Sequence, residues 1–237
     1  LLIYYNKNFL HAFFAIGIAG LLNAIIVALT NITFIISIEN TNVANTLIML
    51  SLAPFMAAFM SLVFLNEFPK KRTWIAMGLC FVFVVFIFFD SYTAGRLYGD
   101  IFGFITAFLV GSSSVVIRYA KIVNFLPSLL LAKFFTILIT IYFVKSFHLE
   151  GSDIYIIPIM CIFMVTIPLM LITLAPRYIP AYEVELFFVL ETTLGPLWVW
   201  LIVHEQPSFK TILGGVMIIL TIIVHTIIEL KNKKITS

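Results

Sequence analysis

Charged side chains are scarce in this sequence: Asp, Glu, Lys and Arg together make up 11% of its 237 residues, whereas hydrophobic residues make up 62%. In a typical soluble domain about a quarter of the residues are charged and about half are apolar. A soluble fold of this length could not bury so much apolar surface and still present a polar exterior. The scarcity of charge therefore argues against a soluble globular protein and indicates that lipid is the solvent for much of the chain.

The sequence also lacks the residue groupings on which metal, nucleotide and nucleic-acid chemistry depend. Its two cysteines, Cys80 and Cys161, lie inside apolar runs without a second Cys or a His at ligand spacing, so we expect free, buried thiols. No glycine-rich loop leads into a phosphate-binding Lys. The net charge is only +3, with no basic stripe for nucleic acid. We therefore expect no metal, no cofactor, no nucleic-acid partner and, without a catalytic arrangement, no enzymatic activity.

Long apolar runs are what the sequence has in abundance. A helix needs about 20 apolar residues to cross the hydrocarbon core of a bilayer. Eight segments qualify, and polar residues are confined to the short connections between them. The predicted spans are 10–36, 43–65, 73–92, 98–118, 125–147, 153–176, 181–203 and 209–230. The sequence thus predicts an all-α membrane protein with eight transmembrane helices.

The distribution of Lys and Arg predicts the orientation of these helices. With eight spans both termini lie on the same side of the membrane. That side holds ten basic residues, the opposite side holds three, and Lys133 lies inside a span. Positive charge concentrates in cytoplasmic loops. We therefore predict that both termini are cytoplasmic, and we expect the plasma (inner) membrane as the location.

A short pattern recurs at an offset of 138 residues. Residues 65–69 and residues 203–207 each end an apolar run with a Glu that is followed two residues later by Pro. By the charge distribution, Glu67 faces the cytoplasm and Glu205 faces the outside, so the two copies are inverted. Inverted repeats around a site near the membrane midplane are typical of secondary transporters. Alternatively, Glu followed by Pro is an ordinary way to end a helix.

Several of these segments resemble the EamA-domain form of the drug/metabolite transporter superfamily. The resemblance rests on residues 177–184, 190–200, 205–208 and 214–215 in the second copy, and on residues 42–45, Pro54 and Glu67 in the first. It implies a ten-helix fold of five plus five inverted helices. Here five predicted spans follow residue 98 but only three precede it, so we expect that the first two helices are missing.

The resemblance also implies a division of the chain. Residues 1–92 would form an incomplete first repeat, with the last three of its helices, and residues 98–230 a second repeat of five helices. Residues 231–237 would form a basic cytoplasmic tail.

Two ionisable residues deep in predicted spans are the strongest candidates for substrate binding. Insertion of a charged side chain at the centre of a membrane helix costs about 2.5–3.5 kcal/mol, so such residues are functional candidates. Glu191 lies ten residues into its span, about 15 Å at 1.5 Å per residue, and Lys133 lies eight residues into its own, about 12 Å. The two could pair across a cavity, or Glu191 could bind a cationic group or a coupling proton. Alternatively, Lys133 extends to the membrane interface.

Five further residues are candidates for lining the same cavity: Asn23, Asn45, Glu183, Ser113 and Arg118. The two asparagines are polar groups inside spans, and Ser113 and Arg118 end a span that carries three consecutive serines. The resemblance favours Glu183. Each has a structural alternative, because serines can bond to their own backbone and acids near a helix N-terminus interact favourably with its dipole.

Small residues and prolines predict how the helices pack and bend. A stripe with a four-residue period allows close approach of a neighbouring helix; it consists of Gly99, Gly103, Ala107 and Gly111. Three prolines inside spans predict kinks; they are Pro54, Pro168 and Pro196.

Taken together, the sequence predicts a secondary-active transporter, an exporter or exchanger, that moves a small polar metabolite by alternating access between inverted repeats. The resemblance implies substrates such as amino acids, nucleoside-like or sulfonium compounds, or drugs. The expected partners are this substrate and membrane lipid, with a coupling proton and a homodimer as open alternatives. A competing interpretation is a transport-inactive helical scaffold or a fragment of such a transporter.

Overall fold

In this computed structural model, the residues described are 14–66, 71–93, 95–143, 151, 153–178, 199–204 and 208–236. These residues form helices and no strands, which confirms the all-α class. The α-helices are α3 (Gly17–Asn40), α4 (Val43–Leu50), α5 (Ala53–Leu65), α6 (Lys71–Thr93), α7 (Leu97–Tyr119), α8 (Leu126–Thr140), α9 (Asp153–Met160), α10 (Ile167–Leu174) and α12 (Phe209–Thr236). A π-helical stretch, Cys161–Thr166, joins α9 to α10; a 3-10 turn, Ala175–Arg177, follows α10; and Val199–Val203 is also π-helical.

Four helical segments are long and apolar enough to cross a membrane: Gly17–Asn40, Val43–Leu65, Leu97–Tyr119 and Asp153–Arg177. Three shorter apolar helices accompany them: Trp74–Ile87, Leu126–Thr140 and Phe209–His225. Each of these seven helices overlaps a predicted span. Of the remaining predicted span, 181–203, only the last five residues are described. The chain is therefore an integral membrane protein, while the total of eight helices and the five-plus-five arrangement remain predictions.

The apolar surface of α9 and the π-helical stretch is exposed instead of packed. Every side chain from Asp153 to Ile167 is exposed within the described structure, and most of them are large and hydrophobic. Such a surface is stable only in an apolar solvent, as expected for a helix that faces lipid. Cys161 lies on this helix and is exposed, so the expectation that it is buried is wrong, whereas Cys80 is free and buried as expected.

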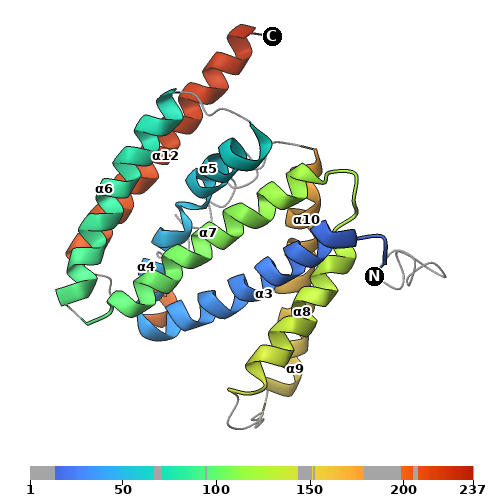
Figure 1. Cartoon of the computed structure of the whole chain (residues 1–237). Helices are drawn as coiled ribbons and strands as arrows, with labels where there is room; N and C mark the ends of the chain where they lie inside the picture. Colours follow the sequence, from blue (N-terminus) through green and yellow to red (C-terminus); the bar gives the residue numbers. More distant parts are fainter. Residues whose placement is uncertain are drawn as a thin grey trace.

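Helix α7 lies at the centre of the packing (Figure 1). It contacts α3 on one side and α4 and α5 on the other, while α3 also packs against α8. Helices α6 and α12 run side by side at one edge of the molecule. The core between these helices includes Met49, Phe55 and Ile218, each of which is almost fully buried.

The small residues of α7 are where its neighbours approach most closely, as the stripe predicted. A Cβ added to Gly99 would lie 2.5 Å from the carbonyl carbon of Asn40, and one added to Gly111 would lie 2.6 Å from the backbone nitrogen of Ala57. These are backbone contacts, one in the first turn of α7 and one in its second half. Helices α3 and α5 can therefore approach α7 only because these positions lack a side chain.

Two of the three predicted kinks lie within the described residues, and the helix is interrupted beside each. A turn at Ser51 and Leu52 separates α4 from α5, and Pro54 stands in the first turn of α5. Pro168 stands in the first turn of α10, directly after the π-helical stretch. Proline removes a backbone donor and clashes with the preceding turn, which explains why a continuous helix does not form there. Pro196 lies outside the described residues.

Candidate functional site

Polar side chains meet along the whole interface between α3 and α7. Three interhelical hydrogen bonds connect the two helices, from Ser113 Oγ to Asn23 Oδ1 at 2.7 Å, from Thr106 Oγ1 to Thr33 Oγ1 at 2.8 Å, and from Ser37 Oγ to the Gly99 carbonyl oxygen at 2.8 Å. The residue numbers rise along α3 while they fall along α7, so the helices are antiparallel. A membrane helix pair would pack adequately with apolar side chains alone, which makes this series of polar contacts a candidate site.

The Asn23 cluster, which consists of Asn23, Ser113 and Ser128, joins three helices at one end of this series. Asn23 is 0% exposed. Its Oδ1 accepts the bond from Ser113, and its Nδ2 donates to Ser128 Oγ at 3.0 Å, while Ser128 in turn donates to the Phe125 carbonyl at 2.7 Å. The structure thus brings together two predicted site residues, Asn23 and Ser113. Ser128 was not predicted, because a single serine in the first turn of a helix carries no distinctive signal.

Lys133 contacts α3 at Asn31, which is eight residues beyond Asn23. Its Nζ donates to Asn31 Oδ1 at 3.3 Å, and Asn31 Nδ2 donates to Thr136 Oγ1 at 3.4 Å. Lys133 and Asn31 are both half-buried. Within the described part of the chain the ammonium group forms no ion pair. Its predicted partner, Glu191, lies outside the described residues, as does Glu183.

A second group of buried polar side chains, the Asp100 cluster, lies at the opposite end of α3 and consists of Thr41, Asn45 and Asp100. Thr41 Oγ1 donates to Asp100 Oδ1 at 2.6 Å, and Asn45 Nδ2 lies 3.2 Å from Oδ1 and 3.4 Å from Oδ2. Asn45 and Asp100 are 0% exposed. Sequence reasoning missed Asp100, although an acid in the first turn of an apolar helix is a recognisable signal.

Arg96 forms a further interhelical contact beside the Asp100 cluster. Its Nη1 donates to Asn42 Oδ1 at 2.6 Å, which ties the α3–α4 connection to the residue that precedes α7. Its Nε is buried and has no hydrogen-bond partner among the described residues. Together with the Asp100 cluster, this contact fastens α3, α4 and α7 to one another at this membrane end.

Among the described residues, the predicted site residues fall into separate groups. Asn23 and Ser113 touch, and Lys133 and Arg118 each lie five residues, about 7.5 Å of helix, beyond a member of the Asn23 cluster. Asn45 bonds instead to Asp100 beside Thr41, which is 18 residues from Asn23 along the chain, about 27 Å of helix. The described residues contain no group of three or more His, Cys, Asp or Glu that could hold a metal ion.

Comparison with known proteins finds a family match in the N-terminal part of the chain. Residues 1–89 match the model of the EamA-like transporter family, and this segment includes Asn23, Asn31 and Asn45. No curated protein and no solved structure matches the chain. The family match confirms the predicted resemblance to the drug/metabolite transporter superfamily in its EamA-domain form. The matched family is a family of membrane transporters.

Proposed function

We propose that this protein is a secondary-active transporter that exports or exchanges a small polar metabolite. The observation that carries the proposal is the contact between Lys133 and Asn31, which holds an ammonium group inside the helical bundle. Insertion of such a charge into a membrane helix costs about 2.5–3.5 kcal/mol, and charged residues within spans usually face a pathway. Helix association alone would not require the charge, because neutral side chains can form the same kind of hydrogen bond.

The direction in which Lys133 extends supports a role in the membrane interior. Asn23 bonds to Ser128, so these two residues lie at the same depth. Asn31 is eight residues farther along α3, about 12 Å, whereas Lys133 is only five residues beyond Ser128 on α8, about 7.5 Å. To reach Asn31, the ammonium group therefore extends along α8 away from the end at which the Asn23 cluster lies. A lysine that extended to the interface beside that cluster would point the opposite way.

Alternating access then assigns a role to the Asp100 cluster. A transporter of this kind exposes its central site to one side of the membrane at a time. The bonds from Thr41 and Asn45 to Asp100, together with the contact between Arg96 and Asn42, close one end of the bundle. We infer that these contacts form a gate that breaks when this end opens. By the positive-inside rule this end faces away from the cytoplasm, and both termini face the cytoplasm.

The residues near Lys133 indicate the kind of substrate. An ammonium group beside the amide of Asn31 and the hydroxyl of Thr136 is suited to bind a small metabolite with a carboxylate. We propose that Glu191, in the second repeat 98–230, supplies a complementary negative charge for an amino group or a coupling proton. The repeat formed by 1–92 and this second repeat would rock against each other around that site.

Transport by the full chain in proteoliposomes tests this proposal. Exchange of labelled amino acids and related carboxylates would be compared for the parent protein, Lys133→Gln, Lys133→Arg and the control Lys121→Gln. Lys121 is an exposed cation in the α7–α8 connection. We expect Lys133→Gln to lower exchange at least tenfold, Lys133→Arg to retain part of it, and the control to be unaffected. Full exchange by Lys133→Gln would refute the role of Lys133, and a parent protein that exchanges none of the panel would favour the inactive scaffold.

A further inference from the structure

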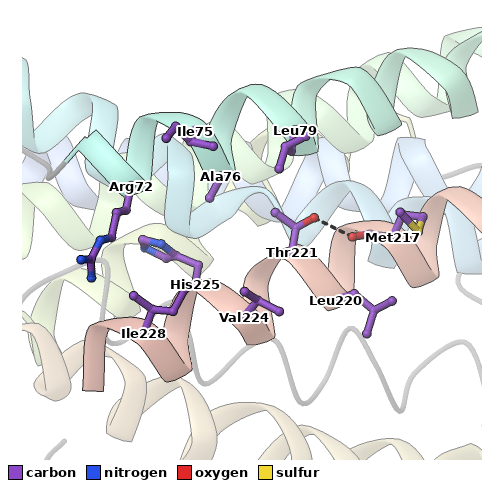
Figure 2. Close-up of a pocket in the computed structure, with 10 residues that line it drawn as sticks. All are labelled: Arg72, Ile75, Ala76, Leu79, Met217, Leu220, Thr221, Val224, His225 and Ile228. Carbon is purple, nitrogen blue, oxygen red and sulfur yellow. Dashed lines mark hydrogen bonds between the residues drawn. The ribbon is translucent and has the colours of Figure 1, made fainter. Parts of the chain in front are cut away.

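A groove of about 470 Å³ lies between α6 and α12 (Figure 2). Its walls are almost entirely apolar, formed by Ile75, Ala76, Leu79, Met217, Leu220, Val224 and Ile228. The hydroxyl of Thr221 donates to the Met217 carbonyl of its own helix at 2.7 Å, so it adds little polarity to the groove. The remaining polar lining residues, Arg72 and His225, lie together towards one end.

The groove extends over about half the thickness of a bilayer. On α12 its lining residues run from Met217 to Ile228, which is 11 residues or about 16 Å of helix. The hydrocarbon core of a membrane is about 30 Å thick. An apolar channel that starts near one membrane surface and ends near the midplane has the length of one lipid leaflet. A helix from a second copy of the chain would instead contact α6 and α12 over their whole membrane-spanning length.

Basic residues stand at the end of the groove where Arg72 lies. Arg72 and the exposed Lys71 form the first turn of α6, where the helix dipole also favours an anion. Helix α12 runs antiparallel to α6 and reaches the same end with its C-terminal part (Figure 1). A basic end and an apolar channel together complement a ligand with an anionic head and a hydrocarbon tail.

We propose that this groove is a binding site for one anionic phospholipid from the leaflet at this end, whose acyl chain lies between α6 and α12. The phosphate lies at Arg72, and the chain passes Ala76 and Leu79 on α6 and Val224 and Met217 on α12. Ala76 leaves room for the chain because its side chain is a single methyl group. The contribution of one basic residue near an anionic membrane surface corresponds to about a fivefold preference. Neutral lipids would occupy the groove without this preference.

Native mass spectrometry of the full chain, purified with equal amounts of phosphatidylglycerol and phosphatidylcholine of matched acyl chains, tests the charged end. We expect one retained phosphatidylglycerol, about fivefold enriched over phosphatidylcholine. Arg72→Gln should abolish the enrichment. Lys121→Gln removes an exposed cation from the α7–α8 connection, outside the groove, and should leave the enrichment intact. Equal retention of both lipids by the parent protein, or equal loss in both variants, would overturn the site.

A second pair of variants tests the apolar channel. Val224 lines the groove and is 54% exposed, so Val224→Trp should fill the channel without disturbing the core. Its neighbour Ile223 is 41% exposed and does not line the groove, so Ile223→Trp is the matched control at the same depth. We expect Val224→Trp alone to lose the retained lipid. A lipid-free dimer that Val224→Trp dissociates would refute the lipid and identify a second copy of the chain as the occupant.

Discussion

The hydroxyl group of Thr41 lies 2.6 Å from Oδ1 of Asp100, and both residues are buried. Thr41 directly follows α3, whereas Asp100 stands in the first turn of α7, 59 residues later. The same carboxyl group accepts a hydrogen bond from Asn45 on α4. One side chain of α7 therefore holds the ends of two other helices in place.

Replacement of Asp100 by Asn should weaken this connection. The amide keeps one oxygen, which can still accept the bond from Thr41, but its NH2 group would face the NH2 group of Asn45. A buried donor without an acceptor costs about 1–3 kcal/mol. We expect Asp100→Asn to lower the free energy of unfolding in detergent by about this amount.

The control for this prediction is Glu39→Gln, because Glu39 is an exposed acid near the same end of α3. Thermal unfolding monitored by circular dichroism would compare the two variants. Equal stability of Asp100→Asn and Glu39→Gln would show that the Asp100 cluster does not fasten these helices.

Neighbouring serines on α7 provide a second prediction. Ser113 bonds across the interface to Asn23, whereas Ser112 bonds to the Phe108 carbonyl of its own helix at 2.7 Å. Interhelical hydrogen bonds in membrane proteins contribute about 0.6 kcal/mol on average and about 1.7 kcal/mol at most. We expect Ser113→Ala to destabilise the protein within this range and Ser112→Ala to have almost no effect, as measured by unfolding in mixed micelles. A larger effect of Ser112→Ala would contradict this assignment.

Local sequence rules predicted the features that depend on one helix at a time. The interruptions of the α-helix beside Pro54 and Pro168 follow from the missing backbone donor of proline, and the close contacts at Gly99 and Gly111 follow from the missing side chain. The ends of spans were less accurate: the first was predicted at 10–36, whereas α3 runs Gly17–Asn40.

Contacts between helices could be predicted only in part, because they depend on rotation and depth. Asn23 and Asn45 carry the same polar group inside apolar runs, yet they belong to different clusters at opposite ends of α3. Asp100 was missed because it stands at a helix end, where an acid has an ordinary local explanation. Its bonds to Thr41 and Asn45 depend on the packing of α3 and α4 against α7, which sequence periodicity does not determine.

The glycine stripe on α7 gives a third prediction, with a control on α6. A Cβ at position 111 would lie 2.6 Å from the Ala57 nitrogen, and this backbone can move only if α5 shifts. Overpacking of this kind costs about 1–3 kcal/mol. At Gly78 a Cβ would meet nothing within 4 Å. We therefore expect Gly111→Ala to destabilise the fold and Gly78→Ala to stabilise it by up to about 1 kcal/mol, since alanine favours the helix. Unfolding temperatures of the two variants would decide the matter.

An inverted arrangement of the two repeats would determine where single cysteines can be labelled. Asn66 follows α5 and is exposed, and Gln206 is its counterpart in the second copy at the offset of 138 residues. If the copies are inverted, Asn66→Cys should react with a membrane-impermeant maleimide only from the cytoplasmic side, and Gln206→Cys only from the outside. Cys80 and Cys161 would first be replaced by alanine. The replacement of Cys161 is the more important of the two, because Cys161 is exposed and could react with the maleimide, whereas Cys80 is buried. Reaction of both cysteines from the same side would mean that the repeated pattern marks parallel copies, and a gate at Asp100 would then have no counterpart on the opposite side of the membrane.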